Sequence, residues 1–259
     1  MKIIGTWVLF LGVIAVNALA NILPINGYNT GQISAFYPNT FVPAGFTFSI
    51  WGVIYLLLLF YTIGFTYYTL KQEQYPKAFA LIECINIYFL LTCVFNMSWI
   101  VAWHYLQIEL SLVIMLLFLI TLMQLFLKSS TMVHDLTLTQ KFILQTPFIV
   151  YLGWISVATI ANSTALLVAY KWNGFGMTPV YWSAAMILIA IVLAAVMLIK
   201  FKAVPFALVV AWALWGIYNA QGSAAPILAN ITSVGIKILC TASLITFLIA
   251  TGKLKWLKQ

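Results

Sequence analysis

Tryptophan and asparagine recur at helical spacing in two apolar stretches of the sequence. Asn96 lies three positions before Trp99. Tyr151 likewise lies three positions before Trp154. Residues three or four positions apart share one face of a helix. A buried indole usually needs a hydrogen-bond partner for its N–H group. A nearby asparagine side chain can supply that partner. These pairs predict helix faces that carry large rings and a few hydrogen-bonding groups.

A third aromatic stretch, residues 43–55, runs from a Pro-Ala-Gly turn straight into an apolar segment. Ala158 and Asn162, four positions apart, extend the face that begins at Trp154. Rings from three helices suit a large planar apolar ligand. The same rings and small residues are also found where helices only pack together. The residues alone leave both interpretations open. The candidate binding residues are Phe48, Trp51, Tyr55, Asn96, Trp99, Tyr151, Trp154, Ala158 and Asn162.

Side chains suited to catalysis or metal binding are few. Neither His104 nor His134 is paired in the sequence with a nucleophile or a second metal ligand, and both are expected outside the helices. His104 is expected at the membrane interface or as a cap on the cavity, and His134 with Asp135 as solvated loop residues. The three cysteines fall in apolar runs without metal-ligand spacing and are expected to be small core residues. We therefore expect a protein that is not an enzyme and binds no metal.

The composition is that of a multi-pass membrane protein. Of the 259 residues, 64% are hydrophobic and only 6% are charged, whereas a soluble domain carries roughly a quarter of its residues as charges. The lipid bilayer is therefore the expected surroundings. The twelve basic residues are all lysines and are scattered along the chain, which argues against a nucleic-acid partner, since such a partner needs a dense basic face.

Eight stretches are long enough to cross a hydrocarbon core of about 30 Å as helices. The expected fold is thus an all-α integral membrane protein with eight transmembrane helices. Ten lysines lie in the connections on one side and only Lys171 in those on the other, so the positive-inside rule places the N and C termini in the cytoplasm. The stretches are 3–23, 45–69, 79–103, 109–127, 142–169, 180–199, 204–221 and 227–250.

Residues 1–20 also fit a secretory signal, because Lys2 precedes an apolar run and Ala18-Leu19-Ala20 fits a cleavage site. We expect a retained helix, since the run is long enough to span. In this topology Trp51, Trp99 and Trp154 lie too deep for an interfacial aromatic belt. Such a belt accounts for Trp103, Trp172, Trp182 and Trp256.

Lys237 lies near the middle of the last expected helix, where a lysine costs about 2.5–3.5 kcal/mol on insertion scales. We therefore expect it to face protein or water rather than lipid. Glu83 and Glu109 lie near helix ends, so neither is level with it. Lys237 could fix helix packing, bind an anionic ligand, conduct ions or hold a retinal-type chromophore. No carboxylate is placed as a counter-ion for the last of these.

The three aromatic segments resemble the signature regions of the tryptophan-rich sensory protein family, also called the translocator protein or peripheral benzodiazepine receptor family (TspO/MBR). The first loop of that family ends in a proline and aromatic entry followed by Trp and Tyr. Here Pro43, Phe48, Trp51 and Tyr55 are similar to it. The family has a further proline just before this tryptophan, where the present chain has Ile50.

The other two motifs of the resemblance lie on the third and fifth helices. A Leu-Asn-x-x-Trp motif is matched by Asn96 and Trp99, with Phe95 in the leucine position. The fifth helix of the family carries Pro-Tyr-Leu-x-Trp-x-x-x-Ala and a later Asn. With two residues inserted after the proline, this chain is similar at Pro147, Tyr151, Leu152, Trp154, Ala158 and Asn162.

The resemblance covers residues 1–170 and implies a five-helix TspO-like bundle there, followed at 171–259 by three further helices and a short basic tail. It implies a receptor or transport protein in a bacterial-type cell membrane. A planar hydrophobic ligand such as a protoporphyrin would bind in an intramembrane aromatic pocket, and a homodimer is possible. The alternative is a secondary transporter of a small solute that uses Lys237. Weak internal similarity between 147–154 and 205–212 is compatible with it, because transporters are often built from repeats.

Overall fold

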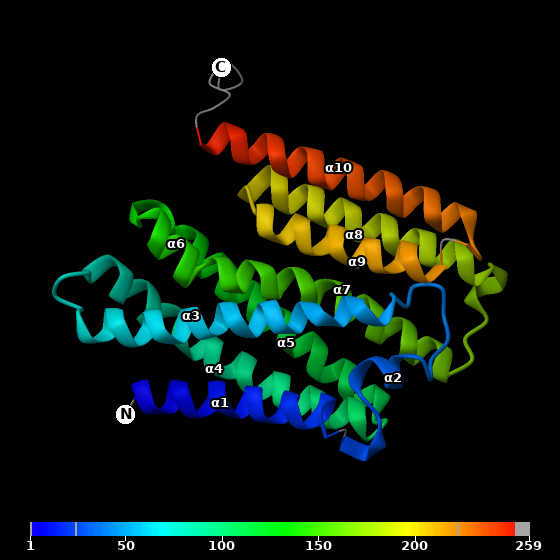
Figure 1. The fold of residues 1–259 in the computed structure, drawn as a ribbon, viewed down its shortest axis with the longest axis horizontal. Coiled ribbons are helices and arrows are strands. Elements are labelled where there is room, and N and C mark those ends of the chain that lie inside the picture. The colour runs from blue at the N-terminus through cyan, green and yellow to red at the C-terminus, as the bar shows by residue number, and fades with distance from the viewer. Residues whose placement is uncertain (1, 24, 222, 252–259) are drawn as a thin grey trace.

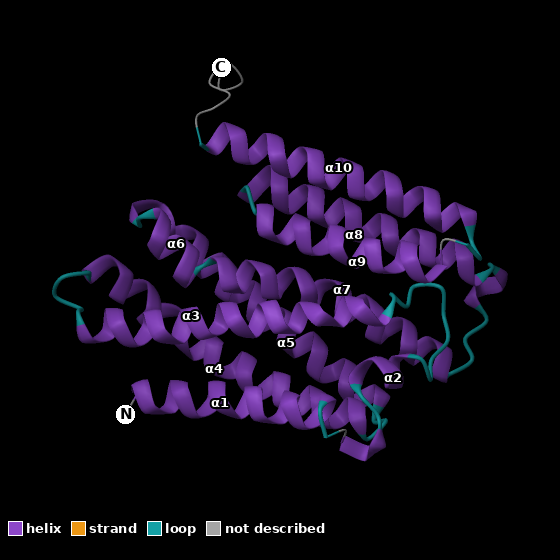
Figure 2. Ribbon diagram, viewed as in Figure 1, coloured by secondary structure: helices purple, strands orange, loops and turns teal. Residues whose placement is uncertain are grey.

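The computed structural model describes residues 2–23, 25–221 and 223–251, and every regular element within them is a helix (Figures 1 and 2). Eight of these helices are long and apolar enough to cross a membrane, as the sequence predicts. They are α1 (Lys2–Asn21), α3 (Ile50–Leu70), α4 (Pro76–His104), α5 (Ile108–Met132), α7 (Thr146–Ala169), α8 (Pro179–Phe201), α9 (Val204–Gln221) and α10 (Pro226–Ala250). The expected basic tail with Lys253, Lys255, Lys258 and Trp256 lies outside the described residues.

Shorter elements connect the long helices. Two are α-helices, α2 (Thr30–Ser34) and α6 (Leu138–Leu144), and four are single 3₁₀ turns. A membrane interior offers no water to backbone N–H and C=O groups, so apolar segments satisfy these groups internally as helices. Prolines stand in the first turn of α4, α7, α8 and α10, where the missing N–H costs no hydrogen bond. The turns are η1 (Ile25–Gly27), η2 (Gly45–Ser49), η3 (Val133–Asp135) and η4 (Gly174–Gly176).

The expected single helix at 142–169 is wrong in one respect, because the structure divides it at Gln145 into α6 and α7. Pro147 cannot donate a backbone hydrogen bond to the preceding turn, which favours a break there. The separated α6 packs against α3. At their contact Gly64 lies so close to Ile143 that a Cβ atom at Gly64 would overlap with that side chain.

The long helices form two groups. The five helices α1, α3, α4, α5 and α7 pack together, and α8, α9 and α10 form a second layer beside them, with α10 at the outer edge (Figure 1). The two groups meet mainly where α9 packs against α7. There Gly153 faces Phe206 so closely that an added Cβ would lie 3.3 Å from the Phe206 backbone. A small residue at this position allows the two helices to approach closely.

Polar contacts between helix ends agree with the alternating topology. At one end Lys2 pairs with Glu83, and the Lys77 Nζ atom lies 2.9 Å from Asp135 Oδ2. These pairs bring together the starts of α1 and α4 and the turn that follows α5. At the opposite end the Tyr170 hydroxyl donates to Glu109 at 2.8 Å. The placement of the first of these ends in the cytoplasm stays a prediction.

Candidate functional site

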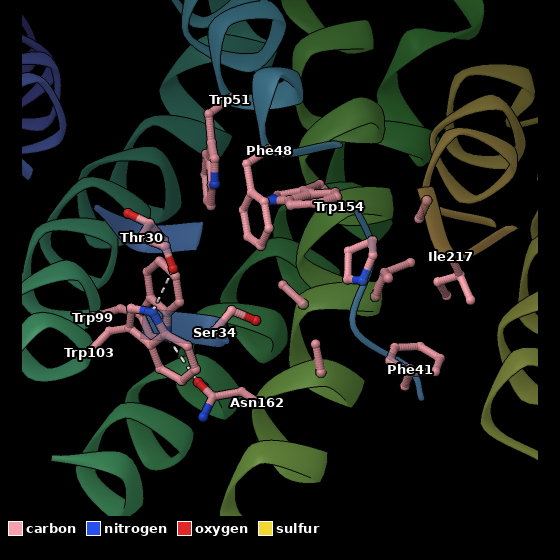
Figure 3. Close-up of a pocket in the computed structure, with 15 residues that line it drawn as sticks. Thr30, Ser34, Phe41, Phe48, Trp51, Trp99, Trp103, Trp154, Asn162 and Ile217 are labelled. Atoms are coloured by element: carbon pink, nitrogen blue, oxygen red, sulfur yellow. Dashed lines mark hydrogen bonds between the residues drawn. The ribbon is translucent and has the colours of Figure 1, made fainter. Parts of the chain in front are cut away.

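A cavity lies between α3, α4, α7, α9 and the loop that connects α1 to α3 (Figure 3). Its empty volume is about 600 Å³, part of it open to the surroundings. None of the side chains that line it is charged. Six of the nine residues that the sequence nominates line this cavity: Phe48, Trp51, Trp99, Trp154, Ala158 and Asn162.

Indole rings from three helices form the aromatic part of the wall. Trp51 of α3 lies 6.2 Å from Trp99 of α4 and 6.0 Å from Trp154 of α7, measured between ring centroids. Phe48 approaches Trp154 edge-on at 6.1 Å. Edge-to-face contacts of this kind fix ring orientation beyond what burial alone achieves. The rings are therefore held in place without a ligand, with their remaining faces toward the cavity.

Two of the indoles that line the cavity, Trp99 and Trp154, differ in their hydrogen bonding. Trp99 Nε1 donates to Asn162 Oδ1 at 2.9 Å, and the Asn162 amide nitrogen donates to Ser111 Oγ at 3.0 Å. The partner of Trp99 is thus Asn162 of α7, whereas Asn96, which lies on the same helix as Trp99, donates to Tyr151. Trp154 Nε1 is buried and has no hydrogen-bond partner among the described residues. It lies on the side of the ring that faces Phe48 (Figure 3).

The other three nominated residues, Tyr55, Asn96 and Tyr151, lie beside the cavity and do not line it. Tyr55 stacks on Trp51, with ring centroids 5.6 Å apart and planes inclined by 19°. Asn96 donates to the Tyr151 hydroxyl at 2.8 Å, and Tyr151 meets Trp51 edge-on at 6.0 Å. Tyr55 and Tyr151 thus contact Trp51, and Asn96 holds Tyr151, so the effect of these three residues on a ligand is indirect.

Part of the wall was missed by the sequence reasoning. Val157 and Ala161 lie on the same helical face as Trp154 and Ala158, so helical spacing could have found them. No local pattern pointed to the residues from the first loop or from α9, which reach the cavity only through tertiary packing. These are Thr30, Ser34, Phe41 and Pro43 of the loop region, and Ala213 and Ile217 of α9.

Trp103 and His104 correct two sequence-based expectations. Trp103 does not anchor an interface: it is 5% exposed, stacks on Trp99 at 5.7 Å and lines the cavity. His104 is the last residue of α4 and is fully buried. Its Nδ1 lies 3.2 Å from the Ile25 carbonyl and its Nε2 lies 3.1 Å from Thr30 Oγ1. A neutral ring that donates through Nδ1 and accepts through Nε2 satisfies both contacts.

His104 therefore fastens the first loop to the end of α4, one hydrogen bond away from the cavity wall at Thr30. The loop is ordered locally as well, since Asn29 and Gln32 form a reciprocal capping box at the start of α2. His104 is thus a positioning residue for the loop side of the cavity.

Helix α9 holds the other end of this loop. Trp212 Nε1 donates to the Thr47 carbonyl at 3.0 Å, and the Ala44 N–H donates to the Gly216 carbonyl at the same distance. A Cβ atom on Gly216 would overlap with the Thr47 side chain and lie 3.0 Å from Pro43 Cβ. Only glycine at this position lets η2 lie so close to α9. The second helical layer consequently forms part of the cavity wall.

A second, larger cavity of about 1060 Å³ lies between the last turns of α7 and the start of α8. Trp172 and Trp182 lie at its edge, and the small hydroxyl residues Ser163 and Ser183 contribute to its wall. None of the nominated residues lines it.

Lys237, the remaining candidate, lies on neither cavity. It is exposed on α10, and its side chain forms no ion pair within the described part of the chain. The expectation that it faces protein or water rather than lipid stays a prediction. Among the described residues, no group of three or more His, Cys, Asp or Glu side chains could hold a metal ion.

The fold and the cavity define a multi-pass helical membrane protein with an aromatic internal cavity. The model of the TSPO-like protein family matches residues 2–247, and the chain belongs to that family. The match extends past residue 170, where the motif resemblance ends, and takes in α8, α9 and most of α10. No curated protein and no solved structure shows significant similarity to the chain.

Proposed function

We propose that the first cavity binds a planar hydrophobic ligand of the porphyrin type within the membrane, for sensing or transport, and that the protein is not an enzyme. The single observation that carries this proposal is the ring-walled, uncharged space between α3, α4, α7 and α9. A concave, mostly apolar wall with a few polar groups, here Thr30, Ser34 and Asn162, is typical of sites that bind organic ligands.

The distribution of polar groups orients such a ligand. Trp51, Trp99 and Trp154 offer ring faces and edges for an aromatic macrocycle. An unpaired carboxylate inside this uncharged wall would be costly. The acidic groups of a protoporphyrin therefore stay at the opening, and the macrocycle occupies the interior. The unpaired Trp154 N–H supports a ligand that presents a hydrogen-bond acceptor to it.

Titration of the detergent-solubilised protein with protoporphyrin tests the proposal, read through tryptophan quenching and through the absorbance of the porphyrin. We expect saturable binding that is weakened in Trp51→Phe and Trp154→Phe. The matched control is Trp7→Phe, because Trp7 donates to Thr66 on the α1 side and lies away from the cavity. Absence of saturable binding, or equal affinity in all three variants, would remove the basis of the proposal.

Solute transport through Lys237 is the alternative, and no structural observation favours it. For Lys237 to take part in transport, its ammonium group would have to reach an internal solute site. Lys237 is instead exposed on the outermost helix. Solute flux in proteoliposomes that disappears in Lys237→Met would restore this alternative, and flux that persists would remove it.

A further inference from the structure

The outermost helix, α10, presents polar residues on the face that it turns away from the protein. Its buried face consists of Leu228, Thr232, Gly235, Leu239 and Ser243. Lys237 follows Gly235 by two positions, which is about half a turn around the helix. It therefore lies on the opposite, outward face, where it is exposed.

Lys237 does not stand alone on that face. Asn230, Ser233 and Thr241 precede and follow it at spacings of seven, four and four positions, so the four side chains form one stripe. Asn230, Lys237 and Thr241 are exposed and Ser233 is half-buried. Cys240, expected in the core, is exposed beside them. Within the described residues, the side-chain hydrogen bonds of α10 and the turn after it come from Thr232 and Thr251, not from this stripe.

The stripe lies near the middle of the membrane, where contact with lipid hydrocarbon is unfavourable for polar side chains. Lys237 is eleven residues after the start of α10 and thirteen before its end. At a rise of about 1.5 Å per residue it is roughly 16 Å from one end and 20 Å from the other, close to the centre of a core about 30 Å thick. Its four-carbon stem is too short to reach either interface. A charge at this depth normally pairs within protein or faces water.

No Asp or Glu side chain, all four of which lie within the described residues, can provide that pair. The sequence has four acidic residues. Glu83 pairs with Lys2 and Asp135 with Lys77, both at helix ends, while Glu109 lies in the first turn of α5. Glu73 lies in the connection between α3 and α4. A second copy of the chain has the same four residues, so it also lacks a carboxylate at mid-depth. A symmetric contact through this stripe would bring two ammonium groups together.

We propose that the outward face of α10 binds a transmembrane helix of a different protein, one that carries a carboxylate at the middle of the membrane. The carboxylate pairs with Lys237. Asn230 and Thr241 provide further hydrogen bonds between the helices, and the small side chain of Ser233 allows close approach. This proposal is independent of ligand binding in the aromatic cavity.

Energy transfer in lipid vesicles tests it with a defined probe. The fluorescently labelled full chain is reconstituted with a Leu/Ala host helix that carries one Asp, one Asn or one Leu at its centre. We expect the Asp helix to associate roughly tenfold more strongly than the Leu helix, an increment typical of strong polar contacts between membrane helices. This difference in association between the Asp and Leu helices should vanish in Lys237→Met and persist in Lys237→Arg.

The control variant is Leu188→Met, an exposed position of α8, which should leave the increment unchanged. Loss of porphyrin binding or of thermal stability in Lys237→Met would show that this variant misfolds. The Lys237→Arg variant then decides. If it still binds the Asp helix more strongly than the Leu helix, the proposal is supported, and if it does not, the proposal is overturned. Equal association of the Asp and Leu helices, or energy transfer between labelled copies of the chain through α10, would also overturn it.

Photocrosslinking in the native membrane identifies the natural occupant. A crosslinker at Thr241 lies on the stripe, and one at Ile238 is exposed to its side. The expected result is a protein adduct from position 241 that is weak from position 238 and disappears when Lys237→Met is added. Adducts to lipid alone, or only to a second copy of the chain, contradict the proposal.

Discussion

Two aromatic clusters built by the same three helices differ in whether they enclose space. In the cluster deeper along the helices, Tyr61 of α3, Phe89 of α4 and Phe148 of α7 meet with ring centroids 4.6 to 5.9 Å apart. All three side chains are fully buried, and none lines either cavity. In the other cluster, Trp51 and Trp154 border a cavity of about 600 Å³. Aromatic richness alone therefore does not produce a binding site.

The difference lies in what stands opposite the rings. In the deeper cluster each ring packs against the other two, so large side chains fill the space opposite one another. In the cavity the rings face Ala158, Ala161 and Ala213, together with the first loop. Small side chains opposite large rings leave room that the loop and α9 cover without filling. The deeper cluster should thus govern stability, and the cavity should govern ligand binding.

The largest expected effect is on the deeper cluster. Phe148→Ala removes a fully buried ring and should lower the free energy of unfolding by about 3–5 kcal/mol. Chemical denaturation in detergent micelles measures this loss. Protoporphyrin affinity, determined where the variant is still folded, should remain within a factor of about two. A large loss of affinity would show that the two clusters are not separate.

Gly216→Ala should affect both properties. The new Cβ overlaps with Thr47, so η2 must move away from α9, at a cost of about 1–3 kcal/mol for overpacking. The displaced loop should also weaken porphyrin binding. Gly52→Ala is the matched control, because a Cβ there meets no atom within 4 Å. Unchanged affinity in Gly216→Ala would contradict the role of α9 as part of the wall.

A smaller effect is expected where the cavity wall depends on a polar contact. Asn162→Leu leaves Trp99 Nε1 and Ser111 without their partner and should cost about 1 kcal/mol, as is usual for hydrogen bonds between membrane helices. When Trp99→Phe is already present, Asn162→Leu should lower the free energy of unfolding by less. A double-mutant cycle measured by denaturation gives the coupling, and a coupling of zero would exclude the contact.

The smallest effects distinguish two unpaired polar groups. Tyr61 Oη and Trp154 Nε1 are both buried without a partner among the described residues. Removing such a group is nearly neutral for stability, so Tyr61→Phe should leave ligand affinity unchanged as well. Trp154→Phe should weaken binding of an acceptor-bearing porphyrin by roughly three- to tenfold, the value of one hydrogen bond. Parallel titrations of the two variants make this comparison, and equal affinities would mean that Trp154 donates no bond.

The sequence was sufficient for the eight helices and for four of the rings that line the cavity, those of Phe48, Trp51, Trp99 and Trp154. Hydrophobic length and proline positions are local signals, and the spacing from Trp154 to Asn162 already selects one face of α7. The break at Gln145 was not predicted, because Pro147 is compatible both with a kink and with a new helix start.

Other features could not be read from the sequence, because they depend on distant contacts. Ala213 and Ile217 join the wall only because Gly153 and Gly216 let α9 approach α7 and the first loop. The first loop in turn is held by His104, whose partners lie more than seventy positions earlier in the chain. The outward position of Lys237 follows from the absence of a helix beyond α10 in the described structure, not from any pattern within α10.

Filling the first cavity, and making the same change in the second, tests whether the aromatic cavity is the binding site. Ala158→Phe and Ser163→Phe both place a ring at a half-buried small position on α7, one in each cavity. Protoporphyrin titration should show affinity at least roughly tenfold weaker in Ala158→Phe, because the ring occupies the ligand's space, and near the original value in Ser163→Phe. Equal affinities, or a greater loss in Ser163→Phe, would contradict the assignment of the aromatic cavity as the binding site.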